Sequence, residues 1–215
     1  MNFLKRMAST IEQQYQHPKG LLGWYIGEKM IRQHKPETIW SITLLNLQKD
    51  EDILEIGCGA GYAMKRLVNE PSVHKVIGLD LSKTLLHSAS TRNKLAIRNK
   101  RAQVIHGNVH QLPFKDKQFS KVFSVHSVYF WENLSQALSE ISRVLKPNGA
   151  VSLTLSDGKN GESWDNVKNM IENELIPLMK QMEFTNIKML KGPDSRGYHT
   201  VAITGELLIK MDVIE

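Results

Sequence analysis

The alternation of apolar and polar positions divides the chain into a helical beginning and a longer part in which strands and helices alternate. Residues 1–50 have a helical, aromatic-rich pattern. From Asp52 onward, short runs rich in apolar and β-branched residues have the length and composition of strands. These predicted strands are Ile53–Ile56, Lys75–Asp80, Gln103–His106, Ser120–Val125, Ala150–Leu155, Thr185–Leu190 and Thr200–Thr204. Predicted helices are Tyr62–Asn69, Lys83–Asn99, Leu134–Leu145 and Ser163–Met182.

This order of elements predicts the fold class. Strands that alternate with helices imply right-handed crossovers and a mostly parallel sheet. The last two strands are joined only by residues 191–197, which is too short for a crossover helix, so they should pair as an antiparallel hairpin. We therefore predict an α/β, Rossmann-like, doubly wound seven-stranded sheet, mostly parallel, with a C-terminal antiparallel β-hairpin and additional N-terminal helices.

Length and composition narrow the class of protein. A chain of 215 residues fits a single domain, in which residues 1–50 would form a helical cap on a core of residues 51–215. Cys58 is the only cysteine and the histidines are scattered, so we expect neither an intrachain disulfide nor a bound metal. The N-terminus lacks the apolar run of a secretory signal, and no stretch approaches the length of a transmembrane segment. These features favour a cytoplasmic protein.

The net charge of +6 is compatible with a nucleic-acid partner. However, the densest basic cluster lies around the end of a predicted helix, where positive charge also complements the helix dipole. A solvated basic face is therefore favoured over a nucleic-acid site. The cluster consists of Arg92, Lys94, Arg98, Lys100 and Arg101. The sequence does not indicate the oligomeric state.

Two motifs predict a ligand that contains adenosine. In the first, the apolar strand Ile53–Ile56 runs into the glycine-rich turn 57–61, which opens a helix. Glycines permit sharp turns and close ligand approach, and the helix start offers unpaired N–H groups. In the second, a strand ends at Asp80, 19 positions after Gly61. A carboxylate at that strand tip can accept both hydroxyls of a ribose.

The register of the glycines favours S-adenosylmethionine (SAM) over a nicotinamide dinucleotide. The dinucleotide fingerprint would place its third glycine at position 62, which is Tyr62. The pairs Tyr25-x-x-x-Lys29 and Tyr15-x-x-x-Lys19 have the spacing used by short-chain dehydrogenases, but both precede the glycine loop, whereas in that family the pair follows it. A nucleotide-dependent oxidoreductase is thus the less favoured alternative.

The segment from Asp52 to Leu155 resembles the core of class I SAM-dependent methyltransferases, in particular the small-molecule enzymes of the methyltransferase type 11 group. Five stretches carry the resemblance in the order that the family shows: residues 55–61, 78–82, 107–114, 119–131 and 143–149. Two positions depart from the family pattern. Asn108 stands where the family usually has aspartate, and Asn148 replaces a common glycine. The uncharged Asn108 is expected to weaken the cofactor contact.

The resemblance implies a set of cofactor contacts. Gly57, Gly59 and Gly61 would lie against the methionine part of SAM, with Glu55 acting at the same loop and Cys58 packing within it. Asp80 would hold the ribose, while Leu81, Asn108 and Val109 would surround the adenine. His126 would lie near the sulfonium and the substrate entrance. The cofactor would be SAM and the product S-adenosyl-L-homocysteine (SAH), with no metal.

Methyl transfer is an in-line displacement at an already activated sulfonium carbon, so positioning contributes most, at about 7–11 kcal/mol. A base would help an acceptor that must lose a proton. His126 and Tyr129 are the predicted catalytic residues, with His110 and His17 as further candidates.

The N-terminal segment is expected to cover the substrate with Tyr15, His17, Trp24 and Tyr25, because aromatic faces can hold cations. A small-molecule methyl acceptor is favoured, and the acceptor atom is left open. The alternatives are RNA, a lipid-like acceptor at a membrane surface, and a SAM-binding protein without catalytic activity.

Overall fold

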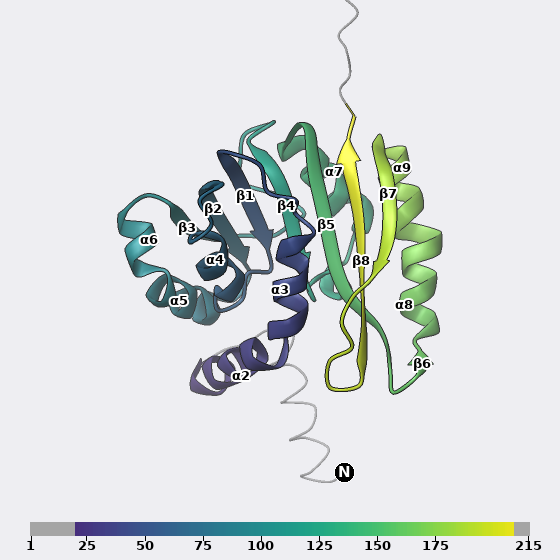
Figure 1. Cartoon of the computed structure of the whole chain (residues 1–215), viewed down its shortest axis with the longest axis horizontal. Helices are drawn as coiled ribbons and strands as arrows, with labels where there is room; N and C mark the ends of the chain where they lie inside the picture. Colours follow the sequence, from purple (N-terminus) through teal and green to yellow (C-terminus); the bar gives the residue numbers. More distant parts are fainter. Residues whose placement is uncertain (1–19, 209–215) are drawn as a thin grey trace, which may run out of the picture.

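The structure is a computed structural model that describes residues 20–208, and it contains a twisted central sheet with helices on both faces (Figure 1). The predicted fold class is confirmed. Each of the seven predicted strands is present, and the short β6 is added after β5. The strands are β1 (Glu51–Ile56), β2 (Val73–Asp80), β3 (Ala102–His106), β4 (Phe119–Val125), β5 (Leu145–Lys159), β6 (Glu162–Ser163), β7 (Phe184–Lys191) and β8 (Tyr198–Leu207).

The strand order is β3-β2-β1-β4-β5-β8-β7. The neighbours from β3 to β5 pair in parallel, whereas β8 pairs antiparallel with both β5 and β7. The predicted C-terminal hairpin is therefore confirmed. In Figure 1 the parallel strands run downward, so their carboxyl ends face the side of the molecule where α2 and the β7–β8 loop lie.

The helices largely follow the predicted pattern. They are α2 (Gly20–Gln33), α3 (Lys35–Thr43), α4 (Tyr62–Leu67), α5 (Lys83–Arg92), α6 (Lys94–Arg98), α7 (Leu134–Val144), α8 (Asp165–Asn169) and α9 (Ile176–Gln181), with the 3-10 turn η1 (Val128–Phe130) and the π-helical segment η2 (Met170–Leu175). The helix predicted at 163–182 begins two residues later and contains η2. Pro177, which has no N–H to donate, lies at the start of α9 and interrupts the regular hydrogen-bond ladder.

The long helix predicted at 83–99 is instead two helices that meet at Asn93. The Asn93 side chain is fully buried, and its amide donates to the carbonyls of Gly61 and Ala89 at 3.0 and 2.9 Å. The periodicity continues through this position, so the break was not visible in the sequence. The break serves to attach α5 to the glycine loop.

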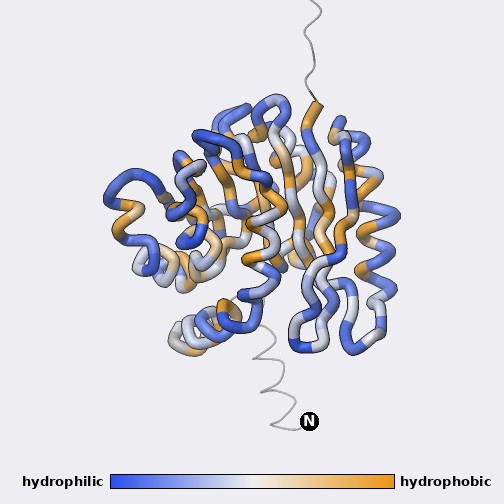
Figure 2. The backbone as a smooth tube through the Cα atoms, viewed as in Figure 1, coloured by the Kyte–Doolittle hydropathy of each residue, from blue (hydrophilic) through white to orange (hydrophobic). Residues whose placement is uncertain are grey.

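Successive side chains of a strand point to opposite faces of the sheet, and hydrophobic residues are frequent along the central strands in Figure 2. On one face, Leu54 and Ile77 pack in a cluster with the buried side of α7 and the α8–α9 segment. On the other face, Ile53 and Val76 pack with α4 and α5. This packing fixes the strands rigidly and leaves their carboxyl ends free to carry loops. Within residues 20–208, no helix is long and apolar enough to cross a membrane.

Candidate active site

The glycine loop after β1 adopts backbone conformations that favour glycine. Gly57, Gly59 and Gly61 have φ angles of 75°, 51° and 75°, in the left-handed region. The N–H groups of Gly57 and Cys58 donate to the Leu79 carbonyl at 2.8 and 3.1 Å, which ties the loop to the end of β2. The loop therefore begins α4 beside the tip of the neighbouring strand, as the sequence predicted from its strand, turn and helix pattern.

Asp80 connects this loop to the one that follows β2. Its Oδ2 accepts a hydrogen bond from the Gly59 N–H, and its Oδ1 accepts one from the Ser82 N–H, both at 2.8 Å. Burial raises the pKa of Asp80, although these amide hydrogen bonds act in the opposite direction. Each carboxylate oxygen has a second lone pair, so the side chain still has acceptor capacity.

Glu55 is a buried carboxyl group on β1. Its side chain is 4% exposed, and its Oε2 atom has no hydrogen-bond partner. Burial raises the pKa of Glu55 well above its usual value, and the charge of Asp80 adds to this effect. A buried unpaired acceptor carries a free-energy cost of about 1–3 kcal/mol, which a donor entering the site would remove.

Two cavities form a continuous cleft along the carboxyl ends of the strands. The first lies over the glycine loop and is lined by Glu55, Cys58, Gly59, Asp80 and His126 among others. The second contains Leu81, Asn108, Val109 and His110. Both are lined by Gly57, Asp80, Ser127 and Phe130. Apart from Gly61, the last residue of the glycine loop, every residue predicted to contact the cofactor lines one of these two cavities.

The second cavity has a polar and an apolar side. Leu81 is 51% exposed there, whereas Val109 is 6% exposed. Asn108 uses its Oδ1 to accept from the His110 N–H at 3.0 Å, which leaves its amide group available. The His110 Nε2 accepts from the Asn133 N–H at 3.2 Å. His110 is thus held at the adenine end predicted for the cleft, away from His126.

His126 lies where the first cavity meets a third one of about 600 Å³. Its φ angle is 57°, which is uncommon for a residue other than glycine, and its N–H is held by the Thr154 carbonyl at 2.8 Å. Burial lowers the pKa of His126 to about 3, with a contribution from the charge of His34. His126 is therefore neutral at neutral pH.

Tyr129 lines the third cavity, and its ring stacks parallel to that of His126 at 6.4 Å. Its hydroxyl donates to the Ser156 carbonyl at 3.0 Å and accepts from the Ser156 N–H. Burial raises the pKa of Tyr129. These contacts favour a role in positioning β5 over a role as a base.

The residues predicted to cover the substrate are only partly described. Tyr15 and His17 lie outside residues 20–208. Trp24 and Tyr25 are 49% and 60% exposed and are absent from the residues that line the three cavities. Helix α2 instead faces the cleft with Gly27, Met30 and Ile31.

Sequence reasoning did not find several residues at the meeting point of the cavities. His34, Glu37 and Arg196 converge there with His126, although they come from the α2–α3 junction, α3 and the β7–β8 loop. His34 and Glu37 are three residues apart, but His34 and Arg196 are 162 residues apart, so no local pattern links Arg196 to the other residues. The C-terminal hairpin brings Arg196 to the carboxyl edge of the sheet.

Comparison with known proteins agrees with this geometry. Residues 54–153 match the model of a methyltransferase domain. An uncharacterized methyltransferase of Bacillus subtilis (strain 168) is 28% identical over 162 residues, which cover 75% of this chain and 86% of that protein. The 24-methylenesterol C-methyltransferase 2 of Arabidopsis thaliana is 29% identical over 107 residues, which cover 50% of this chain and 29% of that protein.

Solved structures share the fold at low sequence identity. The geranyl diphosphate C-methyltransferase from Streptomyces coelicolor A3(2), in complex with Mg²⁺, geranyl diphosphate and SAH, superposes with a TM-score of 0.68 at 15% identity, over 82% of this chain and 81% of that one. The phosphoethanolamine N-methyltransferase 2 of Haemonchus contortus, in complex with SAM, gives a TM-score of 0.66 at 15% identity, over 80% and 52% of the two chains. The motifs, the fold and these relatives together support a class I SAM-dependent methyltransferase, and residues 54–153 are the part of the chain that matches the methyltransferase domain.

Proposed function

We propose that this protein transfers a methyl group from SAM to a small-molecule acceptor by in-line displacement. The observation that carries the proposal is the continuous cleft, which passes from the second cavity over the glycine loop to His126 and opens there into the third cavity. A cofactor that lies along this cleft would have its methyl group at the boundary of the third cavity.

The residues present fit the cofactor. The ribose hydroxyls would donate to the free lone pairs of Asp80, and the adenine would lie between Leu81 and Val109 beside Asn108. The methionine part would lie over Gly57 and Gly59, where a Cβ on Gly57 would already contact Ser127 at 2.5 Å. The unpaired Oε2 of Glu55 would accept a hydrogen bond from the methionine ammonium group.

The third cavity is the proposed acceptor site. Its walls combine aromatic rings with a few polar groups: Met30, Gln33, His34, His126, Tyr129, Phe130, Ser156, Trp164, Asn166, Val167, Arg196 and Tyr198. Its volume of about 600 Å³ lies within the usual range of small-molecule sites, about 300–1,000 Å³. The relatives' names, which mention a methylenesterol, geranyl diphosphate and phosphoethanolamine, support a small molecule as the acceptor class.

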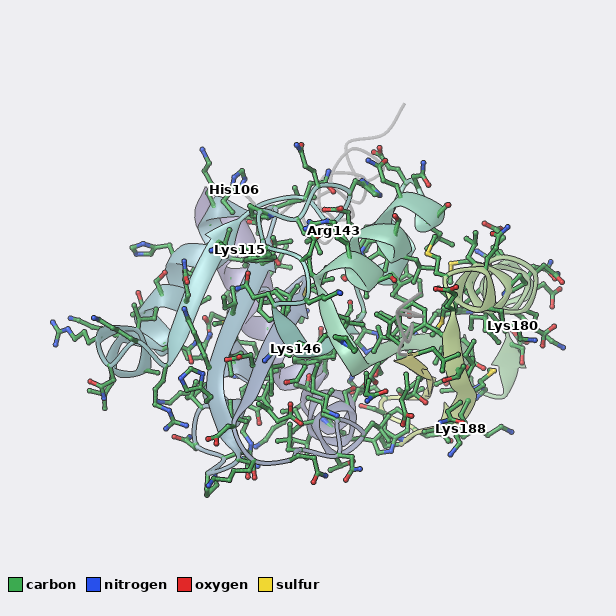
Figure 3. The ribbon with its side chains drawn as sticks, turned by 90° about the horizontal axis from the view of Figure 1, so that it is seen from above. His106, Lys115, Arg143, Lys146, Lys180 and Lys188 are labelled. Carbon is green, nitrogen blue, oxygen red and sulfur yellow. The ribbon has the colours of Figure 1, made fainter. Side chains whose placement is uncertain are left out.

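The distribution of basic residues does not favour RNA as the acceptor. In Figure 3, Lys115, Arg143 and Lys146 lie near the middle of the view, apart from Lys180 and Lys188 at its right side. Arg143 is engaged with Glu140 and Asp116, at 2.7 and 2.8 Å. In the predicted basic cluster, Arg92 pairs with Glu28 at 2.6 Å and Arg101 donates to the Val73 carbonyl at 2.7 Å.

Calorimetric titration with SAM, SAH and NADH tests the cofactor assignment directly. We expect micromolar binding of both sulfur ligands and no binding of NADH. Folded protein that binds neither SAM nor SAH would overturn the proposal, and binding of NADH alone would support the oxidoreductase alternative. Binding of SAM followed by a failure of every acceptor screened would favour a SAM-binding protein without catalytic activity.

Replacing Glu55 with glutamine is expected to weaken SAM binding by about 10-fold to 100-fold, because a charge-assisted hydrogen bond contributes about 1.5–3 kcal/mol. The same change should raise the thermal midpoint of the ligand-free protein at pH 7. Since the folded pKa of Glu55 is raised, its contribution to stability is present below pH 4.5 and is lost as the pH rises through that folded pKa. The gain in E55Q should therefore vanish in acid.

Glu51→Gln is the matched control for this experiment. Glu51 is also buried on β1, at 5% exposure, but its Oε1 accepts from the Gln48 N–H at 3.1 Å and lies 3.7 Å from the Lys121 Nζ. We expect E51Q to lose stability and to bind SAM like the wild type. Unchanged SAM affinity in E55Q, measured by calorimetry, would refute the proposed contact with the ammonium group.

A further inference from the structure

Three side chains with metal-binding groups converge where the cofactor cleft meets the third cavity. They are His34 at the α2–α3 junction, Glu37 on α3 and His126 after β4, and one potential ligand atom from each lies within 4.8 Å of the other two. His34 and His126 line both cavities, whereas Glu37 lies behind them and is fully buried. The proposed binding of SAM assigns no partner to Glu37.

Two of the potential ligand atoms have no hydrogen-bond partner. They are the Glu37 Oε2 and the His126 Nε2, and both atoms are buried. Leaving a buried polar atom unpaired costs about 1–3 kcal/mol, and more when the group is charged. The other oxygen, Glu37 Oε1, lies 3.5 Å from the Arg196 Nη2 and 3.8 Å from the His34 Nδ1, distances that are long for strong hydrogen bonds.

The backbone at His126 is held in a conformation that costs free energy. A residue other than glycine in the left-handed region is strained by about 1–2 kcal/mol, and such strain is concentrated at functional sites. Here the φ angle of 57° accompanies a distance of 4.3 Å between the ring centroids of His126 and His34. A cation bound between the two imidazoles and the Glu37 carboxylate would offset the free-energy cost of this arrangement.

We propose that His34, Glu37 and His126 form a binding site for a divalent transition-metal ion such as Zn²⁺ or Co²⁺. Two imidazoles and one carboxylate are ligands that these ions prefer, whereas Mg²⁺ and Ca²⁺ prefer oxygen ligands alone. Three protein ligands leave a coordination position for an acceptor group in the cavity. The metal site itself stands on these contacts, and only its use in methyl transfer rests on the proposed function. The proposal departs from the sequence-based expectation of no metal.

Arg196 is the competitor for this site. Its Nη2 lies 3.3 Å from the His34 Nδ1 and 3.5 Å from the Glu37 Oε1, so the guanidinium partly compensates the carboxylate charge. The Arg196 side chain is 35% exposed and lines the third cavity. The guanidinium can therefore turn outward when a metal ion enters. Removing this positive charge should make metal binding tighter.

The test is a titration of the full chain, stripped with EDTA, with Co²⁺ followed by visible absorption and with Zn²⁺ in competition. We expect one equivalent to bind, with a loss of at least about 100-fold in affinity for Glu37→Gln and His126→Gln, since each removes one of three ligands. Arg196→Gln, a change at a partly exposed position, should bind Co²⁺ about 10-fold more tightly.

His74→Gln is the matched control, because His74 pairs with Asp52 at 2.8 Å at an exposed position on β2. Its metal affinity should equal that of the wild type. SAH binding measured in EDTA reports on folding and on the cofactor site independently of any metal ion. A failure of the metal site can therefore be distinguished from a failure of the proposed function. Two results would overturn the metal site: no stoichiometric Co²⁺ binding by the wild type, or Co²⁺ affinities of Glu37→Gln and His126→Gln equal to that of the wild type.

Discussion

Replacing Asp80 with alanine should reduce SAM affinity by at least about 100-fold, because two hydrogen bonds from the ribose to a charged acceptor contribute about 1.5–3 kcal/mol each. A second effect adds to this loss. The Asp80 Oδ2 holds the Gly59 N–H, so the substitution also releases the glycine loop from the tip of β2. Calorimetric titration with SAH measures the sum of the two effects.

Asp80→Asn separates the two contributions. Its single amide oxygen can retain one of the backbone hydrogen bonds, while the negative charge that the ribose hydroxyls require is removed. We expect an affinity between those of the wild type and D80A. Asp116→Ala is the control, because Asp116 has an exposed side chain that pairs with Arg143 at 2.8 Å. An SAH affinity in folded D80A equal to that of D116A would show that Asp80 does not hold the ribose.

The fold was predictable because its signals are local. The strand runs, the glycine turn after Ile56 and the short 191–197 connection each depend on neighbouring residues, and together they specify the parallel sheet and its terminal hairpin. The break at Asn93 was not predictable in this way. Its cause is a contact with Gly61, which is 32 residues distant in the chain, and helical periodicity carries no trace of such a contact.

The residues of the candidate site also divide into those that local patterns predict and those that depend on contacts between distant parts of the chain. The glycine loop, Asp80 and Asn108 follow strand ends directly, so motif spacing and strand order place them on one edge of the sheet. Only their aromatic character makes Trp24 and Tyr25 candidates, and the turn of α2 directs them to solvent, while Gly27 and Met30 face the cleft. An aromatic residue can cover a substrate only from the correct face of its helix. When a helix packs through the close approach of its backbone to a neighbouring element, the sequence does not show which face of the helix is turned toward the cleft.

The convergence of His34, Glu37, His126 and Arg196 depends on three separate parts of the chain. Strand β7 runs to the carboxyl edge of the sheet because β8 pairs antiparallel with both β5 and β7, and the β7–β8 loop at that edge carries Arg196 toward α3. Each of these residues is unremarkable in its own sequence context. The chemistry of these residues therefore depends on the tertiary structure. Acceptor sites differ from one another at this level, whereas the cofactor site is common to enzymes that use many different acceptors.

Replacing Gly61 with alanine is expected to destabilise the fold by about 2–5 kcal/mol, the sum of a left-handed backbone cost of about 1–2 kcal/mol and an overpacking cost of about 1–3 kcal/mol. The φ angle is 75°, and an added Cβ would lie 2.8 Å from the Ala89 Cβ and 2.9 Å from the Ala89 Cα. The second contact is with the backbone of α5, so the helix itself would have to shift. The thermal midpoint should fall by about 10 °C.

Gly161→Ala isolates the backbone part of this loss. Gly161 has a φ angle of 85°, and an added Cβ would meet no atom within 4 Å. It should therefore cost only about 1–2 kcal/mol and leave SAH binding unchanged. In G61A, by contrast, displacement of α5 also moves the loop that carries Gly59, so SAH affinity should fall together with stability. Equal losses of stability in the two variants, measured by thermal and urea unfolding, would mean that the contact between the glycine loop and α5 is not closely packed. The cofactor cleft would then lack the rigid support on which precise placement of the methyl group depends.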